Sequence, residues 1–405
     1  MSYINIYSEI GKLNLVMLHC PSRELEAVTP RTMTELLFDD VPYLQNAQKE
    51  HMRFAEVLRE NGVEVVYLEN YLKDVLSNQN VKLQFINDFI ADNDVFSEDA
   101  IMALHEYYHK LDLDSLIKAL FTGVRHDELK VKLFRLPDLI RVDESLFWIA
   151  PLPNLYFTRD PGAALGCGIN IHHMRKKARR AETLFLKYIH KYHPLFVGVP
   201  LWYNRDIGYP IEGGDILVLS KNVVAVGYSE RTSAKGIEVF AKNLLVSKLN
   251  SFDKILVVAI PKTRSFMHLD TVFTMIDHDK FTVHPEASEH MSVYELTLRS
   301  DGELNINYTK DSLSIILAKL LNLPAVKLFM CGDGDTIISE REQWNDGTNT
   351  LALEPGKVIV YDRNYVTNEL LEKNGIKTIV IPSAELSRGR GGPRCMTMPL
   401  NRTDI

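Results

Sequence analysis

The chain has 405 residues, of which 46% are hydrophobic and 24% charged, a composition typical of a globular protein with a sizeable core. Its formal net charge of −7 excludes the strongly basic surface with which a protein binds nucleic acid or an anionic membrane. The sequence has no run near the ~20 apolar residues that span a bilayer, and its first residues do not resemble a secretory signal.

The four cysteines are scattered without CxxC spacing, at Cys20, Cys167, Cys331 and Cys395. This spacing predicts neither a metal knuckle nor a dense disulfide framework, and it favours a reducing cytoplasm. Cys167 and Cys331 lie beside glycines in apolar surroundings, which is typical of buried structural cysteines. Cys395 has a different setting, in a segment rich in arginine and glycine.

The first elements predict an α/β unit. Residues 13–19, LNLVMLH, are a short apolar run before Pro21 and predict a strand. A helix is expected to begin at Pro42, whose missing N–H costs nothing in a first turn, and to stop at Asn61 and Gly62. Residues 63–68, VEVVYL, predict the next strand.

The pattern changes over residues 72–147. The segments LQFINDFIADN, EDAIMALHEYYHKL and SLIKALFTG repeat apolar residues at helical spacing and contain no convincing strand. Asp114 is the expected cap of the last of these helices, and Gly123 is its expected stop. We therefore predict a helical insertion in an otherwise α/β chain.

Two later stretches resemble each other, one running from Asp215 to Pro261 and the other from Asn349 to Pro382. Each reads as a strand, a tight turn, a second strand ending in tyrosine, a polar triplet, a helix and a third strand. An internal repeat is typical of a quasi-symmetric architecture. Two copies leave the number of repeats open, and a chance likeness between α/β units is the alternative.

The segment from Arg388 to Pro399, RGRGGPRCMTMP, carries three arginines and three glycines before Cys395. Nearby positive charge stabilises a thiolate, the form in which a cysteine acts as a nucleophile. The alternative is a disordered basic tail with an idle cysteine. Met396 and Met398 follow directly, so this segment has apolar side chains with which to pack.

His268 and Asp270 lie in the segment FMHLDTVF. In an extended strand residues two apart point to one face, so these side chains are expected to project together. The alternatives are a buried hydrogen-bonded pair without chemistry, or a metal site. A metal would need further ligands, and the sequence has no HExxH or CxxC pattern that supplies them.

Two acidic steps lie beside turn glycines: Asp160 in FTRDPG, and Glu212 with Asp215 in IEGGD. Each step by itself is typical of an ordinary turn. The IEGGD step directly precedes the expected strand DILVLS, which places Glu212 at the mouth of a strand.

Together these residues supply a cysteine, a histidine and several carboxylates, and the sequence has no phosphate-binding loop. A cysteine with a histidine indicates covalent catalysis. Carboxylates near a thiol raise its pKa and disable it, unless the substrate is itself a cation. A guanidinium is planar and stays protonated, and carboxylates bind it bidentately. The pattern therefore favours a guanidine substrate whose charge stabilises the thiolate.

From end to end the sequence resembles the arginine deiminases, within the superfamily of guanidine-modifying enzymes. The order and spacing of the shared motifs are specific, whereas any one of them alone is not. Pro393 and Arg394 depart from the pattern of some relatives, which have glycine and histidine there. The motifs are SEIGKL, ELLFDD (35–40), PLPNLYFTRDPG, IEGGD, FMHLDTVF and GGPRCMTMP.

The resemblance implies an α/β fold over residues 1–405, a five-bladed propeller of quasi-fivefold symmetry known as a pentein, interrupted by the helical insertion at 72–147. It implies hydrolysis of free L-arginine to L-citrulline and ammonia through a covalent amidino-thioether on Cys395. No metal or organic cofactor is implied. We expect a cytoplasmic homodimer that binds neither nucleic acid nor membrane.

The resemblance also implies roles for single residues. Cys395 resembles the nucleophile and His268 the general acid and base, while Glu212 orients His268 and touches the substrate. Asp160 and Asp270 resemble the carboxylates that clamp the guanidinium. Further positions are Asn154, Arg179 and Arg231 at the α-amino acid end, Arg390 on a closing loop, Phe157 in the wall and Asp215 behind it.

The closest alternative is another enzyme of the superfamily, such as an agmatine or dimethylarginine hydrolase or an amidinotransferase. Agmatine has no carboxylate, so Arg179 and Arg231 would serve no purpose there. A peptidyl-arginine deiminase is disfavoured because calcium-site carboxylate clusters are not apparent. A non-catalytic arginine sensor is disfavoured by the complete set of cysteine, histidine and carboxylates, and a nucleic-acid binder because RGRGGPR lacks interleaved aromatic residues.

Overall fold

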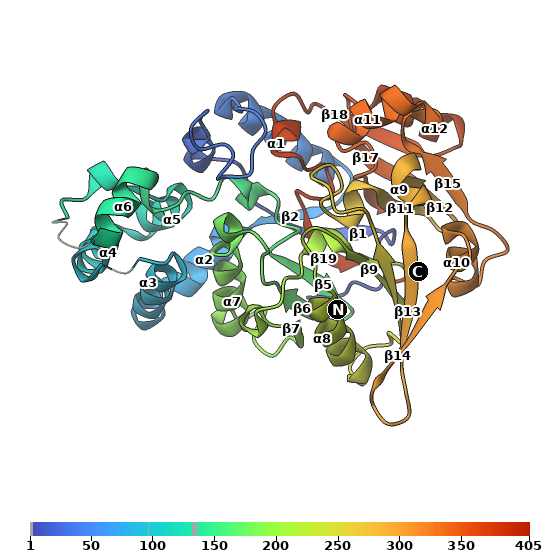
Figure 1. The fold of residues 1–405 in the computed structure, drawn as a ribbon, viewed down its shortest axis with the longest axis horizontal. Coiled ribbons are helices and arrows are strands. Elements are labelled where there is room, and N and C mark those ends of the chain that lie inside the picture. Colours follow the sequence, from blue (N-terminus) through green and yellow to red (C-terminus); the bar gives the residue numbers. More distant parts are fainter. Residues whose placement is uncertain (1–2, 96, 132–135) are drawn as a thin grey trace.

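The computed structural model describes residues 3–95, 97–131 and 136–405, and it is a mixed α/β structure (Figure 1). Five of the sheets in this part of the chain share one design: an antiparallel strand pair whose central strand also pairs parallel with a third strand. A short turn joins the antiparallel pair in four of these sheets, and in the fifth the pair consists of the first and last strands of the chain. The parallel partner needs a longer crossover, which here contains a helix.

The strands of these five sheets are β19 (Met398–Arg402), β1 (Leu13–Leu18) and β2 (Glu64–Tyr67); β5 (Gly162–Leu165), β6 (Gly168–Ile171) and β7 (Leu201–Tyr203); β8 (Ile216–Val218), β9 (Val223–Tyr228) and β10 (Lys254–Ala259); β11 (Phe273–Asp277), β12 (Lys280–Val283) and β15 (Lys327–Met330); and β16 (Leu351–Glu354), β17 (Lys357–Tyr361) and β18 (Lys377–Ile381). The third and fifth of these units are the two stretches in which the sequence predicts a repeat, so that prediction is confirmed.

Helices connect the second and third strands of each unit. They are α1 (Leu44–Glu60), α7 (Glu182–Tyr192), α8 (Ala234–Val246) and α12 (Tyr365–Lys373), while the crossover from β12 to β15 contains α9 (Pro285–Glu289), β13 (Ser292–Leu298), β14 (Leu304–Thr309) and α10 (Leu313–Leu320). Strands β13 and β14 form a hairpin that extends the sheet of β8 to β10 and projects from the body of the molecule (Figure 1). Helix α11 (Thr336–Trp344) lies between β15 and β16.

The first predicted elements are confirmed, with one boundary moved. Strands β1 and β2 fall within the predicted ranges, and α1 ends one residue before Asn61. The helix begins at Leu44 and not at Pro42, because Tyr43 is its N-cap residue in extended conformation. The residue preceding a helix has this conformation as a rule.

The helices of the predicted insertion extend to one side of the molecule (Figure 1). They are α3 (Gln79–Asp92), α4 (Glu98–Lys110), α5 (Leu113–Thr122) and α6 (Leu136–Glu144), preceded by α2 (Leu68–Leu76). Residues 96 and 132–135 of the predicted range lie outside the described residues.

Two expectations for this region are wrong. Strands β3 (Val124–Arg125) and β4 (Phe147–Ile149) pair antiparallel, so the region is not purely helical. The cap of α5 is Asp112, whose carboxylate accepts the Ser115 N–H, whereas Asp114 lies inside the first turn. Gly123 ends the helix with a φ of 72°, as predicted. The capping residue is the one whose carboxylate reaches a free backbone N–H, and the sequence pattern places that residue only to within about two positions.

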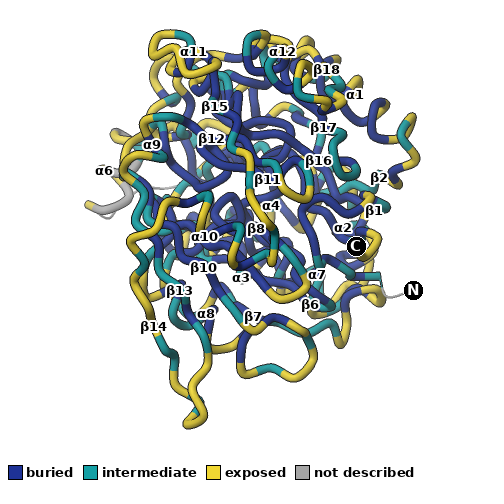
Figure 2. Tube along the Cα trace, turned by 90° about the vertical axis from the view of Figure 1, so that its right-hand side faces the viewer, coloured by how far each residue is buried: buried dark blue, intermediate teal, exposed yellow. Residues whose placement is uncertain are grey.

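The interior lies along the strands and beneath the helices (Figure 2), and it includes the end of the chain. Residues 391–400 are all buried. The alternative of a disordered basic tail is therefore wrong, since Met396, Met398 and Leu400 pack in the core. In the described ranges, the helices are too short or too polar to cross a membrane.

Candidate active site

The loops that enter the first strand of each unit meet at one place. Each of the five loops carries a polar residue there. These are Asp160 before β5, Glu212 before β8, His268 before β11, Asn349 before β16 and Cys395 before β19. Four of them are predicted site residues, so the fold brings together side chains that lie far apart in the sequence.

A small cavity lies where these loops meet, and the space left among its side chains is ≈ 20 Å³, roughly the room that one water needs. Eight of the eleven predicted site residues line it, together with Leu37, Met267 and Gly389. The eight are Asn154, Phe157, Asp160, Arg179, Arg231, His268, Arg390 and Cys395. The other three lie behind the lining: Glu212 hydrogen-bonds His268, Asp270 contacts the Cys395 thiol, and Asp215 accepts the N–H of Leu269, the residue after His268.

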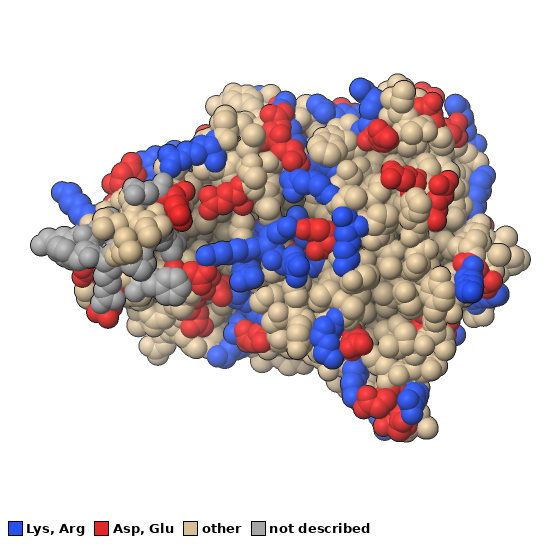
Figure 3. Space-filling model, viewed as in Figure 1, with Lys and Arg blue, Asp and Glu red and all other residues tan. Residues whose placement is uncertain are grey.

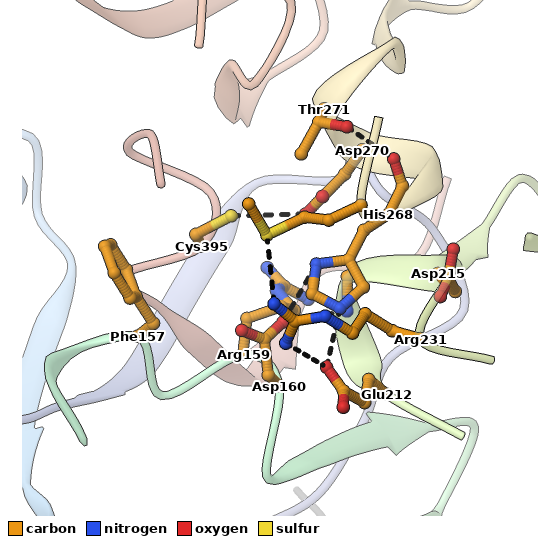
Figure 4. Close-up of polar contacts among 12 residues, drawn as sticks. Phe157, Arg159, Asp160, Glu212, Asp215, Arg231, His268, Asp270, Thr271 and Cys395 are labelled. Carbon is orange, nitrogen blue, oxygen red and sulfur yellow. Dashed lines mark hydrogen bonds and ion pairs between the residues drawn. The ribbon is translucent and has the colours of Figure 1, made fainter. Parts of the chain in front are cut away.

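His268 is held between two carboxylates (Figure 4). Its Nε2 lies 2.7 Å from Glu212 Oε2, and its Nδ1 lies 3.8 Å from Asp160 Oδ1. Burial alone would lower the pKa of His268, but the charges of Asp160 and Glu212 outweigh it and raise this pKa to about 9. His268 is therefore protonated at neutral pH and can donate a proton.

The backbone around His268 differs from the expected strand. His268 itself is extended, but Leu269–Thr271 form a 3₁₀ turn, and strand β11 starts only at Phe273. Asp215 fixes this turn, because its Oδ1 accepts the Leu269 N–H at 2.8 Å. A β-carbon on Gly214 would lie 2.7 Å from His268 Cγ. The glycine pair of IEGGD therefore makes room for the imidazole ring.

Each carboxylate oxygen of Asp160 accepts one hydrogen bond. Its Oδ1 accepts the Gly214 N–H at 3.2 Å, and its Oδ2 lies 2.5 Å from Arg179 Nη1. Arg179 also contacts both oxygens of Glu182 and the carbonyl oxygens of Asn154 and Phe157. Arg179, which is predicted to bind the α-amino acid end of the substrate, therefore contacts Asp160, one of the two predicted clamp residues.

The other two residues predicted for the α-amino acid end lie on the cavity wall. Arg231 Nε lies 2.5 Å from Glu230 Oε2, and Arg231 Nη1 lies 3.5 Å from Glu212 Oε2. Asn154 Nδ2 donates to the carbonyl oxygen of Leu36 at 2.8 Å. Each of these side chains is thus positioned by a protein partner in addition to facing the cavity.

Cys395 lies beside the second predicted clamp residue. Its Sγ is 3.7 Å from Asp270 Oδ2, and this same oxygen accepts Arg394 Nη1 at 2.7 Å (Figure 4 shows the sulfur–carboxylate contact). Arg394 is buried and is also bound by both carboxylate oxygens of Glu9, at 3.0 and 3.1 Å. Arg394 therefore fixes the Asp270 carboxylate, a function that the sequence analysis missed because it treated the loop arginines as a general positive charge.

The expectation that these arginines lower the pKa of Cys395 is wrong. Burial, followed by the charges of Asp270 and Asp160, raises the pKa of the Cys395 thiol well above its usual value. Arg394 faces carboxylates, and the guanidinium carbon of Arg390 lies 3.5 Å from the ring centre of Trp344. Arg394 therefore offsets only part of the negative charge around the sulfur, and the pKa of the thiol stays raised.

The glycines of this loop are required for close approach. A β-carbon on Gly391 would lie 2.3 Å from a ring carbon of Phe157, and one on Gly389 would lie 2.0 Å from the Tyr156 hydroxyl oxygen. A β-carbon on Gly392 would lie 2.7 Å from Cβ of Asn349. The sequence RGRGG thus allows the loop to pack against the cavity wall.

Asn349 is, besides Arg394, a site residue that the sequence motifs do not single out. Its Nδ2 donates to Cys395 Sγ at 3.1 Å, and its Oδ1 accepts the Cys395 backbone N–H at 3.1 Å. The repeat could have indicated it, since Asn349 is the first residue of the second repeat, where the first repeat has the predicted site residue Asp215. In the described part of the chain, His, Cys, Asp and Glu form no group of three that could hold a metal ion.

We expect Cys395 to be a thiol at neutral pH in the free protein. Because its pKa is raised, the rate of its alkylation by iodoacetamide should keep increasing with pH beyond pH 9. The reaction can be followed at this residue by peptide mapping and mass spectrometry. Restricted access to the thiol slows alkylation at every pH but does not move the midpoint of the curve of rate against pH. A midpoint well below pH 7 would therefore contradict the arrangement of carboxylates described above.

Solved structures of low sequence identity share this fold. The amidinotransferase SxtG from Microseira wollei has a TM-score of 0.55 at 15% identity, over 100% of this chain and 98% of that one. The product-bound N-terminal domain of ArgZ, a cyanobacterial arginine dihydrolase, has a TM-score of 0.54 at 13% identity, over 96% of this chain and 97% of that one. At these identities the likeness concerns the fold alone.

Sequence relatives are much closer. The family model for arginine deiminase matches residues 34–402. An arginine deiminase of Clostridium perfringens is 50% identical, over 99% of this chain and 98% of that protein. One of Bacillus cytotoxicus is 49% identical over 99% of each, and one of Borrelia duttonii is 48% identical over 99% of this chain and 98% of the relative. The chain therefore belongs to the arginine deiminase family.

Proposed function

We propose that this protein hydrolyses free L-arginine to L-citrulline and ammonia, as a hydrolase of C–N bonds in linear amidines. The observation that carries the proposal is the thiol of Cys395 beside Asp270, in one cavity with Asp160 and the His268–Glu212 pair. Cysteine and histidine supply a nucleophile and a proton donor. The carboxylates supply the negative charge that a guanidinium needs.

The first half of the reaction forms a covalent intermediate. Asp160 and Asp270 bind the guanidinium and hold its carbon ~3–3.5 Å from sulfur, the distance of a reactive approach. The positive charge of the substrate lowers the pKa of the Cys395 thiol, which loses its proton to solvent, and the resulting thiolate attacks this carbon. His268 protonates the departing nitrogen, the C–N bond breaks, and ammonia leaves. The product of this half is an amidino-thioether on Cys395.

The second half of the reaction hydrolyses the intermediate and regenerates the free enzyme. His268, now neutral, takes a proton from a water molecule, and the hydroxide adds to the amidino carbon. The hydroxyl proton of this adduct passes to the sulfur as the C–S bond breaks, so that citrulline is released and the Cys395 thiol is restored. Glu212 keeps the imidazole in place through both halves, since it hydrogen-bonds Nε2.

The remaining cavity residues give specificity for a free amino acid. Arg231 and Asn154 provide the groups for the α-carboxylate and α-amino end, and Phe157 packs along the aliphatic part. Arg179, also predicted for that end, instead holds the clamp residue Asp160, because its donors are engaged by Asp160, Glu182 and two backbone carbonyl oxygens. Arginine is much larger than the ≈ 20 Å³ left in the cavity. The loop of Arg390 must therefore move for entry and then close over the substrate. Arg390 has a φ of 63°, a conformation unfavourable for a residue with a side chain.

Replacing either clamp residue by alanine should impair turnover as well as binding. Asp160→Ala and Asp270→Ala are expected to lower kcat by about 10²-fold or more and to raise KM, because the carboxylates position the reacting carbon. Steady-state kinetics of citrulline release measure both constants. If only KM changed, these residues would be binding groups with no part in positioning.

The five sheets are proposed to form a closed ring, the five-bladed propeller, with residues 72–147 as its helical insertion. Contacts between successive sheets support this: β5 packs on β19, β1 on β16 and β16 on β11, while the 3₁₀ turn after His268 contacts both β8 and β11. The ring closes where the Gly213 N–H donates to the Asp160 carbonyl oxygen at 3.2 Å.

We further propose a cytoplasmic homodimer. The free state of all four cysteines supports a reducing compartment. Light scattering after size-exclusion chromatography would give the oligomeric state, with a dimer at twice the chain mass of 46.3 kDa.

Basic side chains gather near the centre of the face in Figure 3 but are interspersed with acidic ones. Pairs such as Lys176–Glu230, at 2.5 Å, reduce any attraction for nucleic acid.

The deciding experiment incubates purified protein with arginine, agmatine and methylarginines side by side and measures the ureido product and the ammonia or methylamine released from each. Release of citrulline and ammonia from arginine, with agmatine and methylarginines converted far more slowly, supports the proposal. Preferred turnover of agmatine or of a methylarginine would identify a different enzyme of the superfamily. Binding of arginine without release of ammonia would indicate a sensor.

A further inference from the structure

The side-chain amide of Asn349 has a single possible orientation. Its Oδ1 faces the backbone N–H of Cys395, and its Nδ2 faces the carbonyl oxygen of Asp270, both at 3.1 Å. Exchanging the two amide atoms would place a donor against a donor and an acceptor against an acceptor. The neighbours thus determine which atom is nitrogen.

This orientation directs the second amide hydrogen to the sulfur. One N–H of Nδ2 is used by the Asp270 carbonyl oxygen, and Cys395 Sγ lies 3.1 Å from the same nitrogen. A hydrogen bond from a neutral donor to sulfur is stronger when the sulfur carries a negative charge. The contact therefore favours the thiolate over the thiol, against the carboxylates that surround the sulfur.

The position of Asn349 in the fold matches that of the residues already assigned to the reaction. It lies two residues before β16, as Asp160 lies two residues before β5. Its side chain is wholly buried and bridges the loop of Asp270 to the loop of Cys395. The absence of a side chain at Gly392 is what lets the nucleophile loop reach it.

We propose that Asn349 is a further catalytic residue, which holds Cys395 Sγ in place and stabilises its thiolate form by donating an N–H to the sulfur. The assignment rests on the proposed nucleophilic role of Cys395. Asn349 supplies a fixed dipole where negative charge develops, as oxyanion-binding donors do in acyl-transfer enzymes.

The test compares Asn349→Asp and Asn349→Ala with the wild-type protein. Aspartate has the shape of asparagine but replaces the donor by a negative charge, and alanine removes the donor. Both should move the midpoint of the iodoacetamide reaction at Cys395 upward, by about one to two pH units, the size expected for a lost charge-assisted hydrogen bond. In the citrulline assay, kcat should fall by about 10²-fold while KM changes much less.

The matched control is Asn368→Ala. Asn368 is buried and donates to the Tyr361 carbonyl oxygen at 2.9 Å. Its loss removes a comparable buried amide away from the cavity, and the midpoint at Cys395 should stay where it is. Circular dichroism and thermal melting show which variants fold. If Asn349→Ala does not fold, the nearly isosteric Asn349→Asp decides.

An alkylation midpoint unchanged in a folded Asn349 variant would overturn the assignment, and so would an unchanged kcat. Alkylation does not require turnover of arginine. A wild-type protein that makes no citrulline therefore rejects the proposed function and leaves the alkylation test of Asn349 valid. Conversely, normal citrulline formation by a folded Asn349→Asp rejects the role of Asn349 alone.

Discussion

Replacing Cys395 by serine is expected to reduce citrulline formation by about 10⁴-fold or more, the usual scale for the loss of a catalytic nucleophile. Serine keeps the shape of the side chain, but its hydroxyl is a far weaker nucleophile at neutral pH. The carboxylates that raise the pKa of the thiol would disfavour an alkoxide still more strongly. Steady-state assays with arginine in excess measure this loss.

The covalent intermediate gives an independent check. Wild-type protein quenched in acid during turnover should carry an amidino adduct on the peptide that contains Cys395, and Cys395→Ser should carry none. Cys167→Ser is the matched control, since Cys167 lies in the turn between β5 and β6 and hydrogen-bonds the Leu249 carbonyl oxygen. Full activity of Cys395→Ser would exclude the proposed mechanism.

The loss of activity at high pH should reflect the deprotonation of His268, and it forms the alkaline limb of the pH–activity profile. Its pKa in the folded protein is raised to about 9 from an ordinary value of 6.5, so the imidazolium persists below about pH 9 and is lost as the pH rises through that value. Since His268 must protonate the leaving nitrogen, and bound arginine stabilises the Cys395 thiolate, kcat at saturating arginine is expected to fall above about pH 9. His268→Ala should cost roughly 10²–10⁴-fold at neutral pH, the range of general acid–base catalysis.

Glu212→Gln tests the cause of this limb. The substitution keeps the shape of the side chain and removes a charge that raises the pKa of His268, so the limb should move to lower pH. His284→Gln is the control, because His284 is buried outside the cavity. A limb that stays near pH 9 in Glu212→Gln would show that another group titrates there.

Much of the site could be predicted because its motifs are local. The residues around Asp160, Glu212 and Cys395 carry glycine and proline in patterns that fix short turns, and these turns lie where the sequence places them. The local pattern predicts the wrong backbone for His268, since alternating apolar residues also fit a 3₁₀ turn that Asp215 holds from the loop before β8. A contact between residues 54 positions apart leaves no trace in the local pattern.

The chemistry of Cys395 shows where sequence and tertiary structure divide. The sequence by itself determined the types of groups in the site, the α/β repeat that delivers them and the loop that carries the nucleophile. Only the tertiary structure decided which charges face which atoms: Arg394 pairs with Glu9 and Asp270, Arg390 stacks on Trp344, and Asn349 reaches the sulfur. The physical reason is that electrostatic energies depend on distance and burial, and both are set here by segments 46 to 385 residues apart in the chain.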